Sequence, residues 1–280
     1  MRALLIMLIT AGLWTLVGCG NDSKRWGELD SDADGDSDGD SDNDGDSDSD
    51  GDGDSDSDSD SGQAMLSILK VTIRDFSKEH PDMEMLFPDS EGDDDGPELP
   101  TTGLVSDTLG SDNTPVFVSS TGKDENKKGA IITDAKSFDD WYHTKDGVNK
   151  EFTKEIKLVE TSPGIFEYDN DAFFPLTNDE GFGAEGNPSN YHFTTEIHTG
   201  FTYRGGEVFT FIGDDDLWMF IDDKLVIDLG GLHLSSTGTV KLDDLMLTKN
   251  QLYKMHIFHA ERKMKDSHFK ISTSIEFTVE

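Results

Sequence analysis

Three consecutive carboxylates, Asp214, Asp215 and Asp216, interrupt a run that otherwise has the pattern of buried β-strand. The run reads Phe209-Thr-Phe-Ile-Gly before the acids and Leu217-Trp-Met-Phe-Ile after them. Two unit charges ~4 Å apart interact by about 4 kcal/mol at an effective dielectric near 20. Three acids between two apolar strands therefore need a cation, a dense hydrogen-bond network or a solvent-facing turn. Because the ligands are all oxygen atoms, calcium is the first candidate cation.

Short strand-like runs recur from about residue 64 onward and are divided by Gly, Asn and Asp, which predicts an antiparallel all-β fold in one domain at residues 63–280. The predicted strands are Met65–Ile73, Phe152–Leu158, Gly164–Tyr168, Tyr191–Thr202, Glu207–Gly213, Leu217–Asp222, Lys224–Leu229, Thr237–Leu242, Tyr253–His259 and Phe269–Val279.

Within this domain, Leu217–Ile221 is apolar on both alternating faces, and Val208–Ile212 is so apart from Thr210. Both runs therefore predict strands that are buried on both sides, and Asp222-Asp223 predicts a tight hairpin turn after the first of them.

One or two short helices are expected, and Asp134–His143 is the best candidate. Ser137 could cap it, and Phe138, Trp141 and Tyr142 form an apolar stripe at i, i+3 and i+4. We expect that stripe to pack on the core.

Residues 1–19 have the pattern of a targeting segment. Arg2 precedes the apolar run Ala3–Leu13, which is too short to span a membrane as a helix. The following Leu16-Val-Gly-Cys19 resembles the bacterial lipobox, in which the Cys is lipidated and becomes the first mature residue. Cys19 is the only Cys of the chain. The resemblance implies a lipid anchor in the bacterial cell envelope, with Gly20 fitting the outer membrane and the cell surface; an ordinary signal peptide is the alternative.

Residues 20–62 form an acidic linker with Asp at every even position from Asp30 through Asp60, which makes 16 acids. Such an Asp/Ser/Gly tether cannot bury enough apolar surface to fold, so it is predicted to be disordered. Asp30-x-Asp32-x-Asp34-Gly35 matches the start of an EF-hand loop. However, Ser41 stands where that loop needs its Glu, so a solvated spacer with weak, diffuse calcium association is the preferred interpretation.

The formal net charge is −36, of which the tether's acids supply less than half. An acidic domain without a basic stripe argues against nucleic acid as a partner. It also argues against docking of the domain on anionic lipid, so that a lipid on Cys19 would be its only membrane contact. Neutral polymers, cationic surfaces and divalent ions remain as partners.

The block from Gly205 to His233 resembles the bacterial fibro-slime domain, a branch of the PA14 β-barrel superfamily. Other segments agree with that family in order: Phe138-x-x-Trp141-Tyr142, Tyr168–Leu176, Gly181-Phe-Gly183, Asn190–Thr194, Glu196-Ile-His198, Leu242-Asp-x-Leu245 and Phe258–Arg262. The resemblance covers about residues 68–280. It implies a PA14-like β-sandwich or barrel that binds carbohydrates or partners and is not an enzyme.

The resemblance also implies a calcium site. In the adhesin branch an adjacent Asp-Asp pair, often joined by a cis peptide, coordinates calcium, which then takes two sugar hydroxyls. The matching pair here is Asp214-Asp215, with Asp216 where many relatives have Gly. We therefore expect Asp214, Asp215 and Asp216 as metal ligands, and Asp214, Asp215 and His233 as ligand-binding residues. The alternative is a structural turn whose carboxylates accept backbone N–H bonds.

The remaining polar residues favour structural roles. His256 and His259 lie an odd number of positions apart and so face opposite sides of one strand, and with His268 they are interpreted as structural histidines. Glu261-Arg262 predicts an ion pair or a loop tie. No His-Glu-x-x-His, Gly-x-Ser-x-Gly or phosphate-binding Gly-rich motif occurs, so no catalytic residues are predicted.

Three functions remain open from the sequence. The first is a surface lipoprotein whose module binds extracellular polysaccharide or a matrix or surface protein with the help of calcium, as in adhesion or slime formation. The second is a structural protein of the envelope or slime matrix that recognises no glycan. The third, the weakest, is a hydrolase of matrix glycans.

Overall fold

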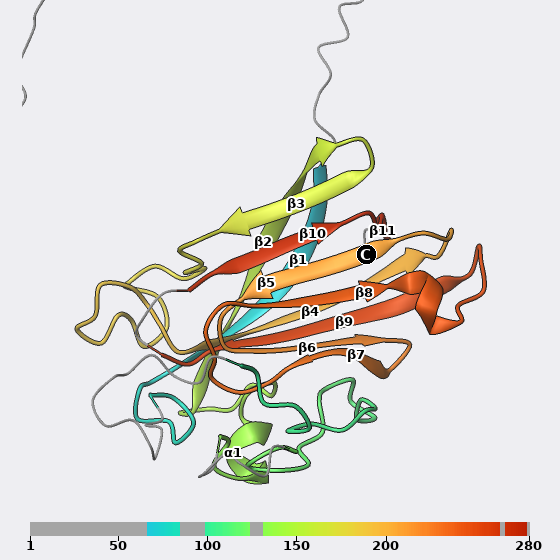
Figure 1. Cartoon of the computed structure of the whole chain (residues 1–280). Helices are drawn as coiled ribbons and strands as arrows, with labels where there is room; N and C mark the ends of the chain where they lie inside the picture. Colours follow the sequence, from blue (N-terminus) through green and yellow to red (C-terminus); the bar gives the residue numbers. More distant parts are fainter. Residues whose placement is uncertain (1–65, 85–98, 124–130, 264–266, 279–280) are drawn as a thin grey trace, which may run out of the picture. The chain divides into compact units, whose positions relative to one another are not determined.

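The computed structural model describes residues 66–84, 99–123, 131–263 and 267–278 (Figure 1). All of them belong to one compact unit, Ser59–Glu280. The predicted leader (1–19), its lipidation site Cys19 and the predicted tether (20–62) lie outside the described residues. Over the part of the chain that is described, no helix is both long and apolar enough to cross a membrane.

The described residues form a single antiparallel sheet of eleven strands with one short α-helix, α1 (Ala135–Asp139), and one 3₁₀ turn (Leu242–Leu245). This confirms the predicted all-β fold with one or two short helices. The strands are β1 (Leu66–Phe76), β2 (Asn149–Ser162), β3 (Ile165–Asn170), β4 (Phe193–Thr202), β5 (Val208–Gly213), β6 (Asp216–Ile221), β7 (Lys224–Leu229), β8 (Ser236–Lys241), β9 (Leu252–Glu261), β10 (Phe269–Thr273) and β11 (Phe277–Thr278).

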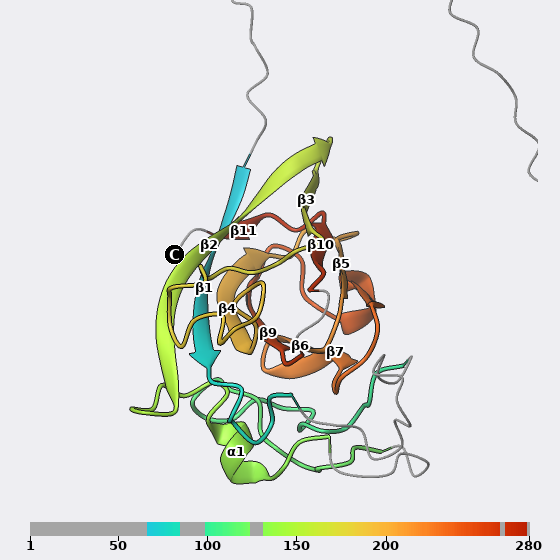
Figure 2. The same ribbon diagram turned by 90° about the vertical axis from the view of Figure 1, so that its left-hand side faces the viewer.

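The sheet curls into a near-closed barrel. Its strand order is β7-β6-β9-β4-β1-β2-β3-β10-β5-β8, with β11 added beside β4. The two end strands of this path, β7 and β8, contact each other, and Figure 2 looks into the curled sheet. A Cβ placed on Gly238 of β8 would lie only 2.5 Å from Cγ2 of Ile227 on β7. Glycine at this position therefore permits the close approach of β7 and β8.

The core consists of two apolar clusters on opposite sides of the sheet. The larger fills the barrel and includes Leu217 and Met219 of β6, whereas Trp218 and Phe220 of the same strand pack into the smaller one. All six residues of β6 are buried, which confirms the prediction for Leu217–Ile221. The matching prediction for Val208–Ile212 is wrong, because Val208, Thr210 and Ile212 are only half-buried on the outer face of β5.

The smaller cluster lies beneath the barrel, where α1 covers it (Figure 1). The helix is shorter than predicted. Asp134 caps it by accepting hydrogen bonds from the amides of Lys136 and Ser137, so Ser137 is not the cap but its partner in a capping box. Trp141 and Tyr142 follow the helix and are buried, as the apolar stripe predicted.

The turn between β6 and β7 is the tight hairpin that Asp222-Asp223 predicted. Both residues have positive φ angles, 50° and 62°. Two successive positive φ values are typical of a type I′ turn, in which Asp is tolerated where Gly is more common.

Candidate cation site at the acidic turn

The three acids form the turn that joins β5 to β6. Asp216 is the first residue of β6 and pairs with Ala260 of β9. Among the described residues no peptide bond is cis, so the cis bond that the resemblance implied between Asp214 and Asp215 is not observed. Instead the chain reverses at Asp215, which has a φ of 57°. A left-handed conformation at a non-glycine residue is uncommon and is found where the surroundings hold it.

Asp216 is engaged in a buried ion pair with Arg262, which follows β9. Its Oδ2 lies 2.7 Å from Nε of Arg262, and both side chains are fully buried. Its Oδ1 accepts a hydrogen bond from the amide of Gly231 at 2.5 Å. Both carboxylate oxygens of Asp216 therefore have partners, and the partner of Oδ2 is a positively charged guanidinium. This geometry does not favour Asp216 as a metal ligand.

Arg262 also ties loop segments to the barrel. Its Nη1 donates to the main-chain carbonyls of Asp82 at 3.3 Å and Ile131 at 2.9 Å, and its guanidinium carbon lies 4.9 Å from the centre of the Trp141 ring. The predicted loop tie is therefore present. The carboxylate that pairs with Arg262 is Asp216, however, and not the neighbouring Glu261.

Asp214 and Asp215 each give one carboxylate oxygen to a main-chain amide. Oδ2 of Asp214 accepts from the amide of His268 at 3.0 Å, and Oδ2 of Asp215 accepts from the amide of Arg262 at 2.8 Å. Such bonds are those of the structural alternative, and they fix both carboxyl groups at the end of β9 and the start of β10. The prediction that Asp214 and Asp215 bind a metal stays a prediction.

Glu261, the last residue of β9, lies beside these acids, although the sequence predicted for it only an ion pair or a loop tie. Its side chain is buried; Oε1 accepts from the amide of Lys263 at 3.3 Å, while Oε2 has no hydrogen-bond partner in the described part of the chain. Burial raises the pKa of Glu261 well above its usual range, and the charge of Asp215 raises it further. Burial likewise raises the pKa of Asp215.

The acidic turn thus brings several carboxyl groups close to one another. Arg262 is paired with Asp216, and the nearby charges of Asp214 and Asp215 both act to raise the pKa of Glu261. The carboxylates of Asp214, Asp215 and Glu261 are not arranged in advance for one ion. Among the described residues, a single group of three acid or His side chains has its ligand atoms within 4.8 Å of one another, and that group lies elsewhere. A cation here would have to turn Asp214, Asp215 and Glu261 toward one another.

His233, the third predicted ligand-binding residue, is buried and faces main-chain oxygens. Its Nδ1 lies 2.8 Å from the carbonyl of Leu234 and its Nε2 lies 3.2 Å from that of Leu229. Its own carbonyl oxygen accepts from the amide of Asp215 at 3.4 Å. His233 therefore contacts the acidic turn through its main chain, and the prediction that it binds ligand stays a prediction.

The other histidines separate as predicted along β9. His259 lies in the aromatic interior of the barrel, 5.2 Å from the centre of the Phe269 ring, and burial lowers its pKa to about 3. His256, on the opposite face, contacts His198 through their Nδ1 atoms, and burial lowers its pKa to about 4. Neither residue reaches the acidic turn.

Comparisons with known proteins agree with this architecture. Residues 144–277 match the family model of the PA14 domain. Among curated proteins, psiQ of Dictyostelium discoideum is 39% identical over 191 residues, which cover 63% of this chain and 19% of psiQ. Protein psiC of the same organism is 36% identical over 221 residues, covering 75% of this chain and 41% of psiC. The chain thus spans between about a fifth and two fifths of the length of these relatives.

Two solved structures show only distant similarity. The PA14 domain of the MpAFP antifreeze protein matches with a TM-score of 0.24 and 9% identity, covering 29% of this chain and 42% of that one. The PA14 sugar-binding domain from an RTX adhesin matches with a TM-score of 0.25 and 12% identity, covering 32% of this chain and 52% of that one. Residues 144–277 of this chain are therefore similar to the PA14 domain.

Proposed function

We propose that this chain is a cell-surface lipoprotein that displays a non-catalytic module for binding carbohydrate or extracellular matrix with the help of calcium. A lipid on Cys19 would anchor it in the bacterial cell envelope, at the outer membrane, and the acidic residues 20–62 would hold the module away from the surface. The proposal places the chain with the fibro-slime branch of PA14-like proteins, as the block from Gly205 to His233 suggests.

The observation that carries the proposal is the orphaned Oε2 of Glu261. A buried carboxyl oxygen without a hydrogen-bond partner among the described residues is costly, and burial together with the charges of Asp215 and Asp214 raises the pKa of this group. A divalent cation would allow these carboxyl groups to ionise together, and an all-carboxylate donor set suits calcium. Asp214, Asp215 and Glu261 would hold it. When bound, calcium can take hydroxyl oxygens of a sugar into its coordination shell, as the resemblance to the adhesin branch implies.

The rival candidate is a structural matrix protein that recognises no glycan. It is favoured by the hydrogen bonds that Asp214 and Asp215 accept from main-chain amides, because a turn that is satisfied in this way needs no cation. The two functions differ in their dependence on calcium.

A glycan array probed with the whole chain, with calcium or with excess chelator, tests the proposal. We expect hits that disappear with chelator and in an Asp215→Asn variant, but persist in Asp146→Asn, which removes one charge at an exposed position. Self-association or capture of envelope proteins that survives chelation, with no calcium-dependent glycan, would instead establish the structural role.

A further inference from the structure

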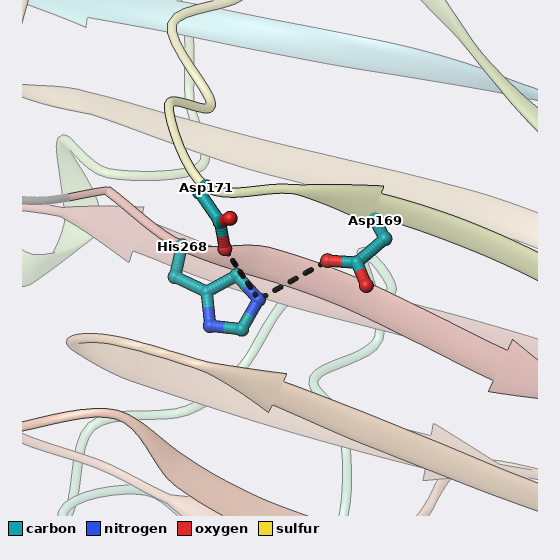
Figure 3. Close-up of side chains that lie close together, drawn as sticks. All are labelled: Asp169, Asp171 and His268. Carbon is teal, nitrogen blue, oxygen red and sulfur yellow. Dashed lines mark hydrogen bonds and ion pairs between the residues drawn. The ribbon is translucent and has the colours of Figure 1, made fainter. Parts of the chain in front are cut away.

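A second group of polar side chains lies near the acidic turn but is separate from it. Asp169 of β3, Asp171 just after β3 and His268 just before β10 each offer a ligand atom, and these three atoms lie within 4.8 Å of one another (Figure 3). His268 lies 99 positions after Asp169 in the sequence. The antiparallel pairing of β3 with β10, which places Lys270 opposite Asp169, brings them together.

The carboxylates of Asp169 and Asp171 both lie close to the same ring nitrogen of His268. Nε2 of His268 lies 3.3 Å from Oδ1 of Asp169 and 3.5 Å from Oδ1 of Asp171, as Figure 3 shows. Zinc binds nitrogen and oxygen ligands at about 2.0–2.2 Å in a tetrahedron, for which the ligands are roughly 3.3–3.6 Å apart. The two distances from Nε2 therefore match two edges of such a tetrahedron.

The rest of the surroundings hold the group in this arrangement. Nδ1 of His268 lies 3.3 Å from the Ser235 hydroxyl, a position from which a polar group can fix the ring of a metal-binding histidine. Nζ of Lys270 donates a hydrogen bond to Oδ2 of Asp169 at 2.6 Å, and the other oxygen, Oδ1, faces His268. The main-chain amide of His268 donates a hydrogen bond to Oδ2 of Asp214 at 3.0 Å.

His143 shows what an ordinary surface arrangement looks like in the same protein. Its Nε2 lies 3.2 Å from Asp112, and its Nδ1 lies 3.2 Å from Asp139, so the two carboxylates sit at opposite edges of the ring. A single metal ion cannot be shared by ligands placed in this way. At His268, in contrast, the two carboxylates converge on one nitrogen.

We propose that Asp169, Asp171 and His268 form a binding site for a divalent transition-metal ion of the zinc class, with a fourth position open to water or to a donor from a bound partner. Its mixed nitrogen and oxygen ligands distinguish it from the all-oxygen set at the acidic turn. The side chain of His268 is 22% exposed and that of Asp171 is 94% exposed, so the ion can enter from solvent.

Cobalt(II) is the probe, because its visible spectrum distinguishes four-coordinate from six-coordinate binding. The titration uses the whole chain with Cys19→Ser, which removes the one thiol, in excess calcium, which occupies carboxylates of the linker and of the acidic turn. We expect a saturable four-coordinate spectrum that zinc displaces. His268→Gln should abolish it, Asp171→Asn should weaken cobalt binding by at least about tenfold, and Ser235→Ala by about tenfold.

The matched control is His143→Gln, which should bind cobalt like the parent chain. Thermal unfolding of each variant without metal checks that its fold is intact. A six-coordinate spectrum alone, or a four-coordinate one unchanged in His268→Gln, would overturn the proposal. Asp215→Asn keeps Asp214, which accepts from the amide of His268, and it should leave cobalt binding unchanged. Loss of calcium binding in that variant with cobalt binding retained would therefore distinguish the two sites.

Discussion

Asp216 and Arg262 form an ion pair whose two side chains are fully buried, with Nε 2.7 Å from Oδ2. The pair joins the start of β6 to the end of β9, and through Arg262 it reaches the loops at Asp82 and Ile131. One carboxylate of the acidic turn therefore serves the fold, while Asp214 and Asp215 remain as the candidates for function.

Breaking this pair should strongly destabilise the domain. We expect Asp216→Asn to lower the free energy of unfolding by about 3–5 kcal/mol, because it leaves the Arg262 charge buried without its counterion. Urea unfolding followed by tryptophan fluorescence measures the loss. The control is Glu276→Gln. Glu276 forms an exposed ion pair with Arg204, 3.9 Å between Oε2 and Nη2, and its loss should change the free energy of unfolding by no more than about 1 kcal/mol. Similar losses in both variants would contradict the structural role of Asp216.

Closure of the barrel should depend on Gly238. An alanine there would place its Cβ 2.5 Å from Cγ2 of Ile227, so we expect Gly238→Ala to cost about 1–3 kcal/mol of stability through overpacking. Ile227→Ala removes the clashing methyl group. In the double variant the two losses should therefore be less than additive by at least about 0.5 kcal/mol. Strict additivity in a denaturant-based double-mutant cycle would show that β7 and β8 do not meet in this way.

Asp75 should make stability depend on pH. Burial raises its pKa from the ordinary 3.8 to about 7, although the hydrogen bond from the amide of Phe182 acts in the opposite direction. The folded state therefore retains a proton that the unfolded state has lost, and the contribution of Asp75 to stability falls as pH rises from about 4 to about 7.

Asp75→Asn removes this titration. The stability of the variant relative to the parent should rise across that pH range and then stay level, whatever the constant cost of the substitution. Thermal or urea unfolding at several pH values measures the difference, with the exposed Asp146→Asn as control. A difference between parent and Asp75→Asn that does not change with pH would refute the assignment.

The sequence was sufficient for the fold class because local patterns carry that information. Both faces of Leu217–Ile221 are apolar, and the strand proved to be buried on both sides. The same argument failed for Val208–Ile212, because the sheet leaves the outer face of β5 without a covering layer, a fact that depends on topology. Likewise, Trp141 and Tyr142 were correctly assigned to the core, although the helix beside them ends earlier than their spacing suggested.

The site was harder to predict because its contacts join distant segments. Asp216 meets Arg262 across 46 positions, and nothing in the local sequence distinguishes it from Asp214 or Asp215. Glu261 gained its unpartnered oxygen only through burial at the end of β9. The approach of Asp169 and Asp171 to His268 depends on the pairing of β3 with β10, which the local sequence does not show. The resemblance located the acidic turn, but it could not assign the individual carboxylates.

The most direct test of calcium binding at the acidic turn is isothermal titration of the whole chain with calcium near pH 7, in two buffers that differ in ionisation enthalpy. Carboxyl groups must be ionised to bind calcium, whereas burial raises the pKa of both Glu261 and Asp215. The account therefore predicts one saturable event that releases protons, above weak binding by the linker. Glu261→Gln should abolish that event while preserving the fold, because the amide imitates the protonated acid. An identical titration of the parent and Glu261→Gln would contradict the account.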